Sequence, residues 1–94
     1  MHWVYIIHSP STDNYYIGEA SDLKRRIEWH NNHQFKNAST AFASDWELFF
    51  SITVENISIA RKIEAHIKRM KSKKYYHNLK TYPDIVKRLI EKYS

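Results

Sequence analysis

The first thirty residues of the chain contain side chains of the types that transfer protons and bind anions. Tyr5 lies in the apolar run WVYII, and the stretch NYYIGEASDLKRRIEWHN contains Tyr16, Arg26 and His30. Arg26 and His30 are four residues apart, so they share one face of a predicted helix. A purely structural explanation accounts for the same residues: the tyrosines would be ordinary aromatic residues of a sheet, and Arg26 and His30 would lie on a solvent-exposed basic face of a helix. Their spacing alone therefore favours scaffold and leaves a reaction centre as the alternative.

A β-hairpin would bring the two tyrosines together. Side chains alternate across a strand, so Tyr5 and Ile7 share one face of the first predicted strand. If Ile7 opposes Tyr16, then Tyr5 opposes Gly18 and lies diagonal to Tyr16, about 7–8 Å away. Gly18 is the only glycine of the chain, and we expect it to leave open space beside both phenols.

A carboxylate later in the sequence has the chemistry of a metal ligand. Glu64 and Lys68 are four residues apart, and an exposed helix pair of this kind contributes only about 0.3–0.5 kcal/mol. However, Glu64 directly follows Ile63 of an apolar stripe, which predicts a partly buried position where a helix meets the sheet. One carboxylate completed by waters and phosphate oxygens suits Mg²⁺. The histidines lack the spacing of a zinc motif, and the chain contains no cysteine.

The elements that would position these side chains form a small α+β fold, in the order ββαβαα. We expect a three-stranded, mostly antiparallel sheet flanked by helices. The predicted strands are 2–8, 15–19 and 46–54. Helices are predicted to begin at Ser21 or Asp22, at Asn56 or Ser58, and at Pro83. The segment 31–44 is predicted to be an irregular mobile loop, and 71–82 a turn with a short helix.

Apolar residues at helical spacing mark the faces that should pack on the sheet. The predicted inward positions are Leu23 and Ile27 in the first helix, Ile59, Ile63, Ile67 and Met70 in the second, and Ile85, Leu89 and Ile90 in the last.

Composition narrows the class of protein. The 94 residues suit a single domain, 1–94, and 43% of them are hydrophobic, enough for a core. Neither a signal peptide nor a membrane-spanning run is apparent, so we expect a soluble, cytoplasmic protein without a membrane partner. The net charge is +5, and six cations fall between Lys68 and Lys80. Clustered cations attract polyanions, which favours nucleic acid as the partner.

The motifs VYI (4–6), YIG (16–18), DLKRRIEWH (22–30) and KIEAHIKRMKS (62–72) together resemble the GIY-YIG endonuclease superfamily. This superfamily includes the amino-terminal nuclease domain of the bacterial excision-repair excinuclease, and the likeness is greatest to short stand-alone bacterial members. Trp3-Val4-Tyr5 lacks the glycine of the first motif, although it keeps the tyrosine. The resemblance implies a metal-dependent endonuclease that hydrolyses phosphodiester bonds in DNA, in repair, recombination or mobile-element processing.

The resemblance also assigns residues to roles. The implied catalytic residues are Tyr5, Tyr16, Arg26, His30 and Glu64. Glu64 would hold one divalent ion, Mg²⁺ or Mn²⁺, and Arg26 would neutralise charge on the phosphoryl oxygens. The implied substrate-binding residues are Gly18, Lys68, Lys71 and Asn78. Arg25 would replace Arg26 if the helix were rotated.

Two questions stay open from the sequence alone. A tyrosine titrating near 10 is a poor base at neutral pH, so the general base can be Tyr5, Tyr16 or His30. A catalytically weak or inactive nucleic-acid-binding module of the same fold would instead use the basic cluster with Tyr75 and Tyr76 stacking on bases. The simpler alternative is that the cluster is a solvated surface and the two aromatics complete the core. A protein-interaction domain is a third alternative, and a homodimer or a recruiting protein partner remains compatible with the sequence.

Overall fold

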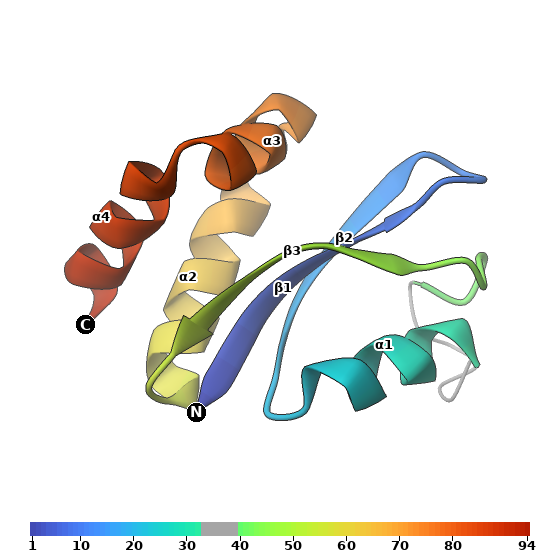
Figure 1. Ribbon diagram of the computed structural model, residues 1–94, viewed down its shortest axis with the longest axis horizontal. Helices are drawn as coiled ribbons and strands as arrows, with labels where there is room; N and C mark the ends of the chain where they lie inside the picture. Colours follow the sequence, from blue (N-terminus) through green and yellow to red (C-terminus); the bar gives the residue numbers. More distant parts are fainter. Residues whose placement is uncertain (33–39) are drawn as a thin grey trace.

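A computed structural model describes residues 1–32 and 40–94 of the chain (Figure 1). Its elements are β1 (His2–Ser9), β2 (Asn14–Ala20), α1 (Leu23–Asn31), β3 (Glu47–Val54), α2 (Ile57–Met70), α3 (Lys73–Thr81) and α4 (Pro83–Tyr93). This α+β architecture confirms the predicted fold class. The basic segment after α2 forms a nine-residue helix, α3, so the described chain contains four helices.

The three strands form an antiparallel sheet in the order β2-β1-β3, with β1 in the centre. Ile7 pairs with Tyr16, and Tyr5 pairs with Gly18, so the predicted hairpin register is confirmed. The pairing of β1 with β3 shifts between Ile6 and Ile7, which indicates a bulge in this pair of strands.

Helices cover both faces of the sheet (Figure 1). α1 lies on one side and encloses a small core built around Tyr5, Ile7 and Trp46. α2, α3 and α4 lie on the other side, where they pack with Val4 and Ile6 in a larger core. Because side chains alternate along β1, this one strand supplies both cores.

Local sequence signals explain where the helices begin. The side chains of Asp22, Asn56 and Ser72 cap α1, α2 and α3 by accepting backbone N–H groups of the first turn. Pro83 stands in the first turn of α4, where a missing N–H has no consequence. In the part of the chain that the structure describes, no helix is long and apolar enough to cross a membrane.

Three expectations need correction. Met70 is 45% exposed at the end of α2 and leaves the apolar stripe that ends at Ile67. Tyr76 is buried and Tyr75 packs partly buried against the larger core, so core packing occupies both rings instead of base stacking. The predicted loop 31–44 begins in α1 and contains buried residues near its end, while positions 33–39 lie outside the described residues.

Candidate functional site

Tyr5 lies at the centre of the side chains that the sequence singles out. Its side chain is buried, and its hydroxyl lies 2.9 Å from Nε2 of His30 on α1. The Tyr5 ring also crosses over Gly18 of β2. A methyl group at position 18 would approach within 2.6 Å of Cζ of Tyr5 and closer still to its hydroxyl. The space expected beside Gly18 is therefore filled by Tyr5, and the glycine is required for that close approach.

Tyr16 completes an aromatic group with Tyr5 and His30. The Tyr16 ring centroid lies 6.4 Å from that of Tyr5 and 5.0 Å from that of His30. Tyr16 is partly buried, whereas Tyr5 is almost fully buried. Of the two phenols, Tyr16 is therefore the more exposed.

A buried threonine holds the other side of His30. Nδ1 of His30 lies 2.7 Å from Oγ1 of Thr40, which is 2% exposed. With the Tyr5 hydroxyl donating to Nε2, the hydrogen on Nδ1 is donated to Thr40. The Thr40 carbonyl in turn accepts from Nε1 of Trp46 at 3.0 Å. The backbone of Trp46 is held by the side-chain amide of Asn31 in both directions.

Sequence reasoning did not find Thr40, Trp46 or Asn31 as supporting residues. Thr40 lies in an irregular polar segment, where no periodicity identifies an inward position. The only available signal is the small apolar run that follows it, Ala41–Ala43, which ends in a buried alanine.

The surroundings of Tyr5 and His30 shift their pKa values in opposite directions. Burial, and next the positive charge of Arg26, lower the pKa of His30 to about 4, so its imidazole is neutral at pH 7. Burial, and next the neighbouring Tyr16, raise the pKa of Tyr5 above its usual value, and Arg26 only partly opposes this. At pH 7 the imidazole of His30 is therefore neutral and the phenol of Tyr5 keeps its proton.

Arg26, rather than Arg25, faces this pair. The charge of Arg26 acts on both Tyr5 and His30, while Arg25 is exposed on the neighbouring face of α1. Both guanidinium groups stack against Trp29, with Cζ 4.9 Å from the ring centroid for Arg26 and 5.7 Å for Arg25. α1 therefore has the rotation that places its second arginine toward the tyrosines.

Glu64 reaches the same region from α2. Its side chain is 18% exposed, and its carboxylate forms an ion pair of 3.2 Å with Lys68 one turn later. The Glu64 charge contributes to the raised pKa of Tyr5, so the carboxylate lies within electrostatic range of the phenol. Nζ of Lys68 also lies 5.8 Å from the centroid of the Tyr16 ring. The predicted partly buried position of Glu64 is thus observed.

A family model described as the GIY-YIG catalytic domain matches residues 1–77. The chain belongs to the GIY-YIG family. No curated protein and no solved structure gave a significant match to it. Members of the GIY-YIG family are generally nucleases, which makes phosphodiester bonds of nucleic acid the expected substrate class.

GIY-YIG nucleases typically use a divalent metal ion, and Glu64 fits a role as its single protein ligand. Among the residues that the structure describes, no group of three or more His, Asp or Glu side chains could hold a metal. One carboxylate is nevertheless sufficient for a hard cation whose other ligands are waters and phosphate oxygens. In this structure the carboxylate of Glu64 forms an ion pair with the ammonium group of Lys68.

Two further candidates, Lys71 and Asn78, lie outside this group of contacts. Lys71 is an exposed residue that ends α2 in the left-handed conformation, with φ 46°. Asn78 is half-buried on α3, where its backbone carbonyl accepts the N–H of Tyr82. Within ranges 1–32 and 40–94, no hydrogen bond or ion pair joins Asn78 to Tyr5 or Glu64. The substrate-binding roles of Lys71 and Asn78 stay predictions.

Proposed function

We propose that this GIY-YIG protein is a metal-dependent endonuclease that hydrolyses phosphodiester bonds in DNA. One observation carries the proposal: the Tyr5 hydroxyl lies 2.9 Å from Nε2 of His30 on α1 and within the fields of Arg26 and Glu64. The side chains available there are a neutral imidazole, a guanidinium and a partly buried carboxylate. Each of these groups can serve in the hydrolysis of a phosphodiester.

Each residue would act through its own chemistry. Arg26 binds a non-bridging oxygen of the scissile phosphate and stabilises the charge that grows on it. Glu64 is the protein ligand of a Mg²⁺ or Mn²⁺ ion, which when bound polarises the phosphate and stabilises the leaving oxygen. Tyr16, the more exposed phenol, orients the attacking water or the phosphate.

The pair Tyr5–His30 favours a particular path for the proton. At neutral pH the raised pKa of Tyr5 keeps its hydroxyl protonated, whereas His30 is neutral and its Nε2 lies within hydrogen-bond distance of that hydroxyl. We infer that Tyr5 takes a proton from the water as it passes its own hydroxyl proton to Nε2 of His30. Oγ1 of Thr40 holds the other ring nitrogen of the imidazole. The attacking hydroxide forms the new P–O bond as the bond from phosphorus to the leaving oxygen breaks. The proton of the water ends on His30, and the leaving oxygen takes a proton from solvent.

Cleavage assays with nicked, branched and plain duplex DNA test the proposal in Mg²⁺ or Mn²⁺. We expect Glu64→Ala and Arg26→Ala to abolish cleavage of the preferred substrate. Glu28→Ala and Lys24→Ala are matched controls, because they remove the same charges from exposed positions of α1. Cleavage that persists in both site variants would contradict the assignment. The preferred DNA structure would separate roles in repair, recombination and mobile-element processing.

One observation supports the alternative of a binding module with weak catalysis. The ammonium group of Lys68 already neutralises Glu64, and a metal ion must compete with it. Salt-sensitive DNA binding without cleavage in either metal would favour this alternative.

A further inference from the structure

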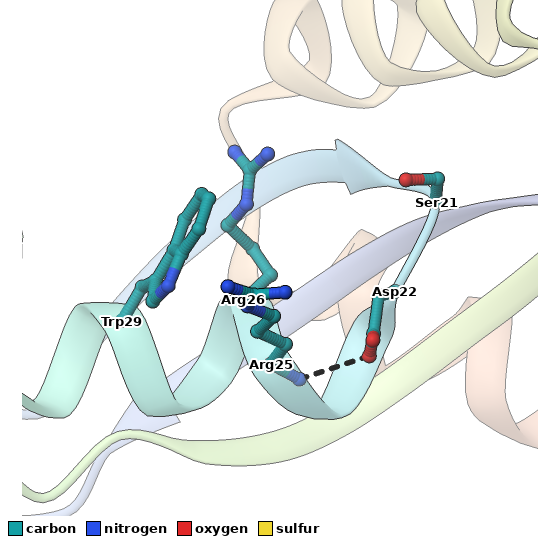
Figure 2. Close-up of a pocket in the computed structure, with 5 residues that line it drawn as sticks. All are labelled: Ser21, Asp22, Arg25, Arg26 and Trp29. Atoms are coloured by element: carbon teal, nitrogen blue, oxygen red, sulfur yellow. Dashed lines mark hydrogen bonds between the residues drawn. The ribbon is translucent and has the colours of Figure 1, made fainter.

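A cavity of about 270 Å³ opens along α1 from the start of the helix and shares Arg26 with the candidate site. It is lined by Ser21, Asp22, Arg25, Arg26 and Trp29. Figure 2 shows the two arginine side chains between the indole of Trp29 and the pair Ser21 and Asp22. Arg26 belongs to both the cavity and the surroundings of Tyr5, so a ligand in the cavity would adjoin the scissile phosphate.

The two guanidinium groups of the cavity both lie beside the Trp29 ring. Both stack against Trp29, at 4.9 Å for Arg26 and 5.7 Å for Arg25. Stacking fixes a guanidinium group while leaving its N–H edge available for a phosphate oxygen. The cavity therefore offers an ordered pair of cations beside an aromatic ring.

The other lining groups indicate that the ligand is more than a phosphate. A simple anion site would exclude a carboxylate, yet Asp22 lines this cavity while one of its oxygens caps α1 through the Arg25 N–H at 3.1 Å. A carboxylate accepts hydrogen bonds from the N–H groups on the edge of a base. An indole gives a stacking surface to any base. Aromatic ring, acceptor and guanidinium together match one nucleotide.

We propose that this cavity binds an unpaired nucleotide of the DNA strand that flanks the scissile phosphate. The base lies against Trp29, its edge faces Asp22, and its phosphate is bound by Arg25. A base within a duplex is stacked and paired, so its face and edge are unavailable to this cavity. The substrate class is therefore DNA with single-stranded character beside the cleaved bond. This inference rests on the proposed function for its biological meaning, but its binding test does not require cleavage.

The test measures dissociation constants of the full chain for a single-stranded oligothymidylate and a blunt duplex, with a chelator present to prevent cleavage. We expect Trp29→Leu, which keeps an apolar side chain, to weaken single-strand binding at least about fivefold, the lower range for losing one base stack. Duplex binding should change less than about twofold, because no base leaves the duplex to stack. Trp29→Phe should restore single-strand binding, since it restores an aromatic face.

Arg25→Gln is compared with Lys24→Gln, which removes the same charge from the same turn of α1 but does not line this cavity. Arg25→Gln should weaken single-strand binding more than Lys24→Gln. In the wild-type protein, NMR should show the Trp29 indole N–H resonance shifting with the single strand and little with the duplex. This measurement does not depend on the folding of any variant.

Equal weakening of both DNAs by Trp29→Leu, or no rescue by Trp29→Phe, would overturn the nucleotide subsite. So would an unmoved Trp29 indole resonance. If cleavage still depended on Glu64 and Arg26 in that case, the endonuclease assignment would hold and only the nucleotide subsite would be rejected. Selective single-strand binding through Trp29, with no cleavage of any DNA, would retain the subsite and reject the endonuclease.

Discussion

The Tyr5 hydroxyl lies 2.9 Å from Nε2 of His30, which joins the central strand of the sheet to the helix that covers its smaller core. The contact depends on Gly18, because the Tyr5 ring passes over that residue. Thr40 then fixes the far side of the imidazole. A substitution of Gly18, His30 or Thr40 should therefore alter the position or the hydrogen bonding of the Tyr5 hydroxyl.

Gly18→Ala adds only one methyl group, but we expect it to lower both activity and stability. The new methyl group would lie 2.6 Å from Cζ of Tyr5, so the phenol must move away from His30. We expect cleavage to fall on the order of 100-fold, because small displacements of reacting groups have effects of that size. Stability to urea should decrease by about 1–3 kcal/mol. Ser51→Ala, opposite Tyr5 on β3, is the control and should retain activity.

Thr40→Val keeps the shape of a buried side chain and removes the oxygen beside Nδ1 of His30. The unpaired N–H should lower the free energy of unfolding by about 1–3 kcal/mol. Cleavage should fall too, because the imidazole loses the hydrogen-bond partner that holds its ring in place. Thr53→Val, at an exposed position of β3, makes the same chemical change outside the site. Equal effects of the two substitutions would refute the role given to Thr40.

His30 should make the fold less stable as the pH falls from about 6.5 toward about 4. The native pKa is about 4 and the ordinary value is 6.5, so between them the unfolded chain binds the additional proton and acid favours unfolding. Above about pH 6.5, His30 makes its full contribution to the free energy of unfolding. Allowing for screening at a half-exposed position, we expect a loss of about 1 kcal/mol.

Urea denaturation of wild type and His30→Gln at pH 7 and pH 4.5 isolates this contribution, because other titrating groups act on both proteins. The wild type should lose more stability than the variant on acidification. A parallel loss would show that His30 is not held neutral by the fold.

The pH dependence of kcat/KM should identify the proton acceptor. If His30 receives the proton, activity rises with pH near its low pKa and is level at neutral pH. If Tyr5 were the sole base, its raised pKa would place the rise in the alkaline range. Single-turnover rates between pH 4 and 10, measured for wild type and His30→Gln, check this. A wild-type rate that still increases beyond pH 9 would exclude His30 as the acceptor.

Lys68→Met should strengthen metal binding while it weakens DNA binding. Removing the ammonium group frees Glu64 from an ion pair, and such a pair corresponds to about a twofold change in affinity. The half-saturating Mn²⁺ concentration should therefore fall about twofold. DNA affinity should decrease because a cation near Tyr16 is lost. Lys62→Met, at an exposed position of α2, should change neither the metal titration nor the preferred substrate.

The three-stranded sheet, and the residues that share one face of a strand or helix, could be predicted from the sequence. Alternation of side chains along a strand and the period of a helix depend only on neighbouring residues. The pairing of Tyr5 with Gly18 followed from strand alternation, and the spacing of Arg26 and His30 followed from the helix period. Contacts from irregular backbone have no period, so Thr40 was not found. Base stacking and core packing were both open for Tyr75 and Tyr76, because their neighbours in the sequence are basic, and tertiary packing decides for the core.

Because the core beneath α1 is the smaller of the two, we expect α1 to open before the rest of the fold. α1 contributes no fully buried residue of its own, whereas α2 contributes four. Elements with little buried surface open first, at free energies below that of global unfolding. Arg26 and His30 can therefore detach with α1 while the larger core and Glu64 stay folded. Amide exchange in α1 would then report the fraction of molecules that are momentarily inactive, without loss of the fold.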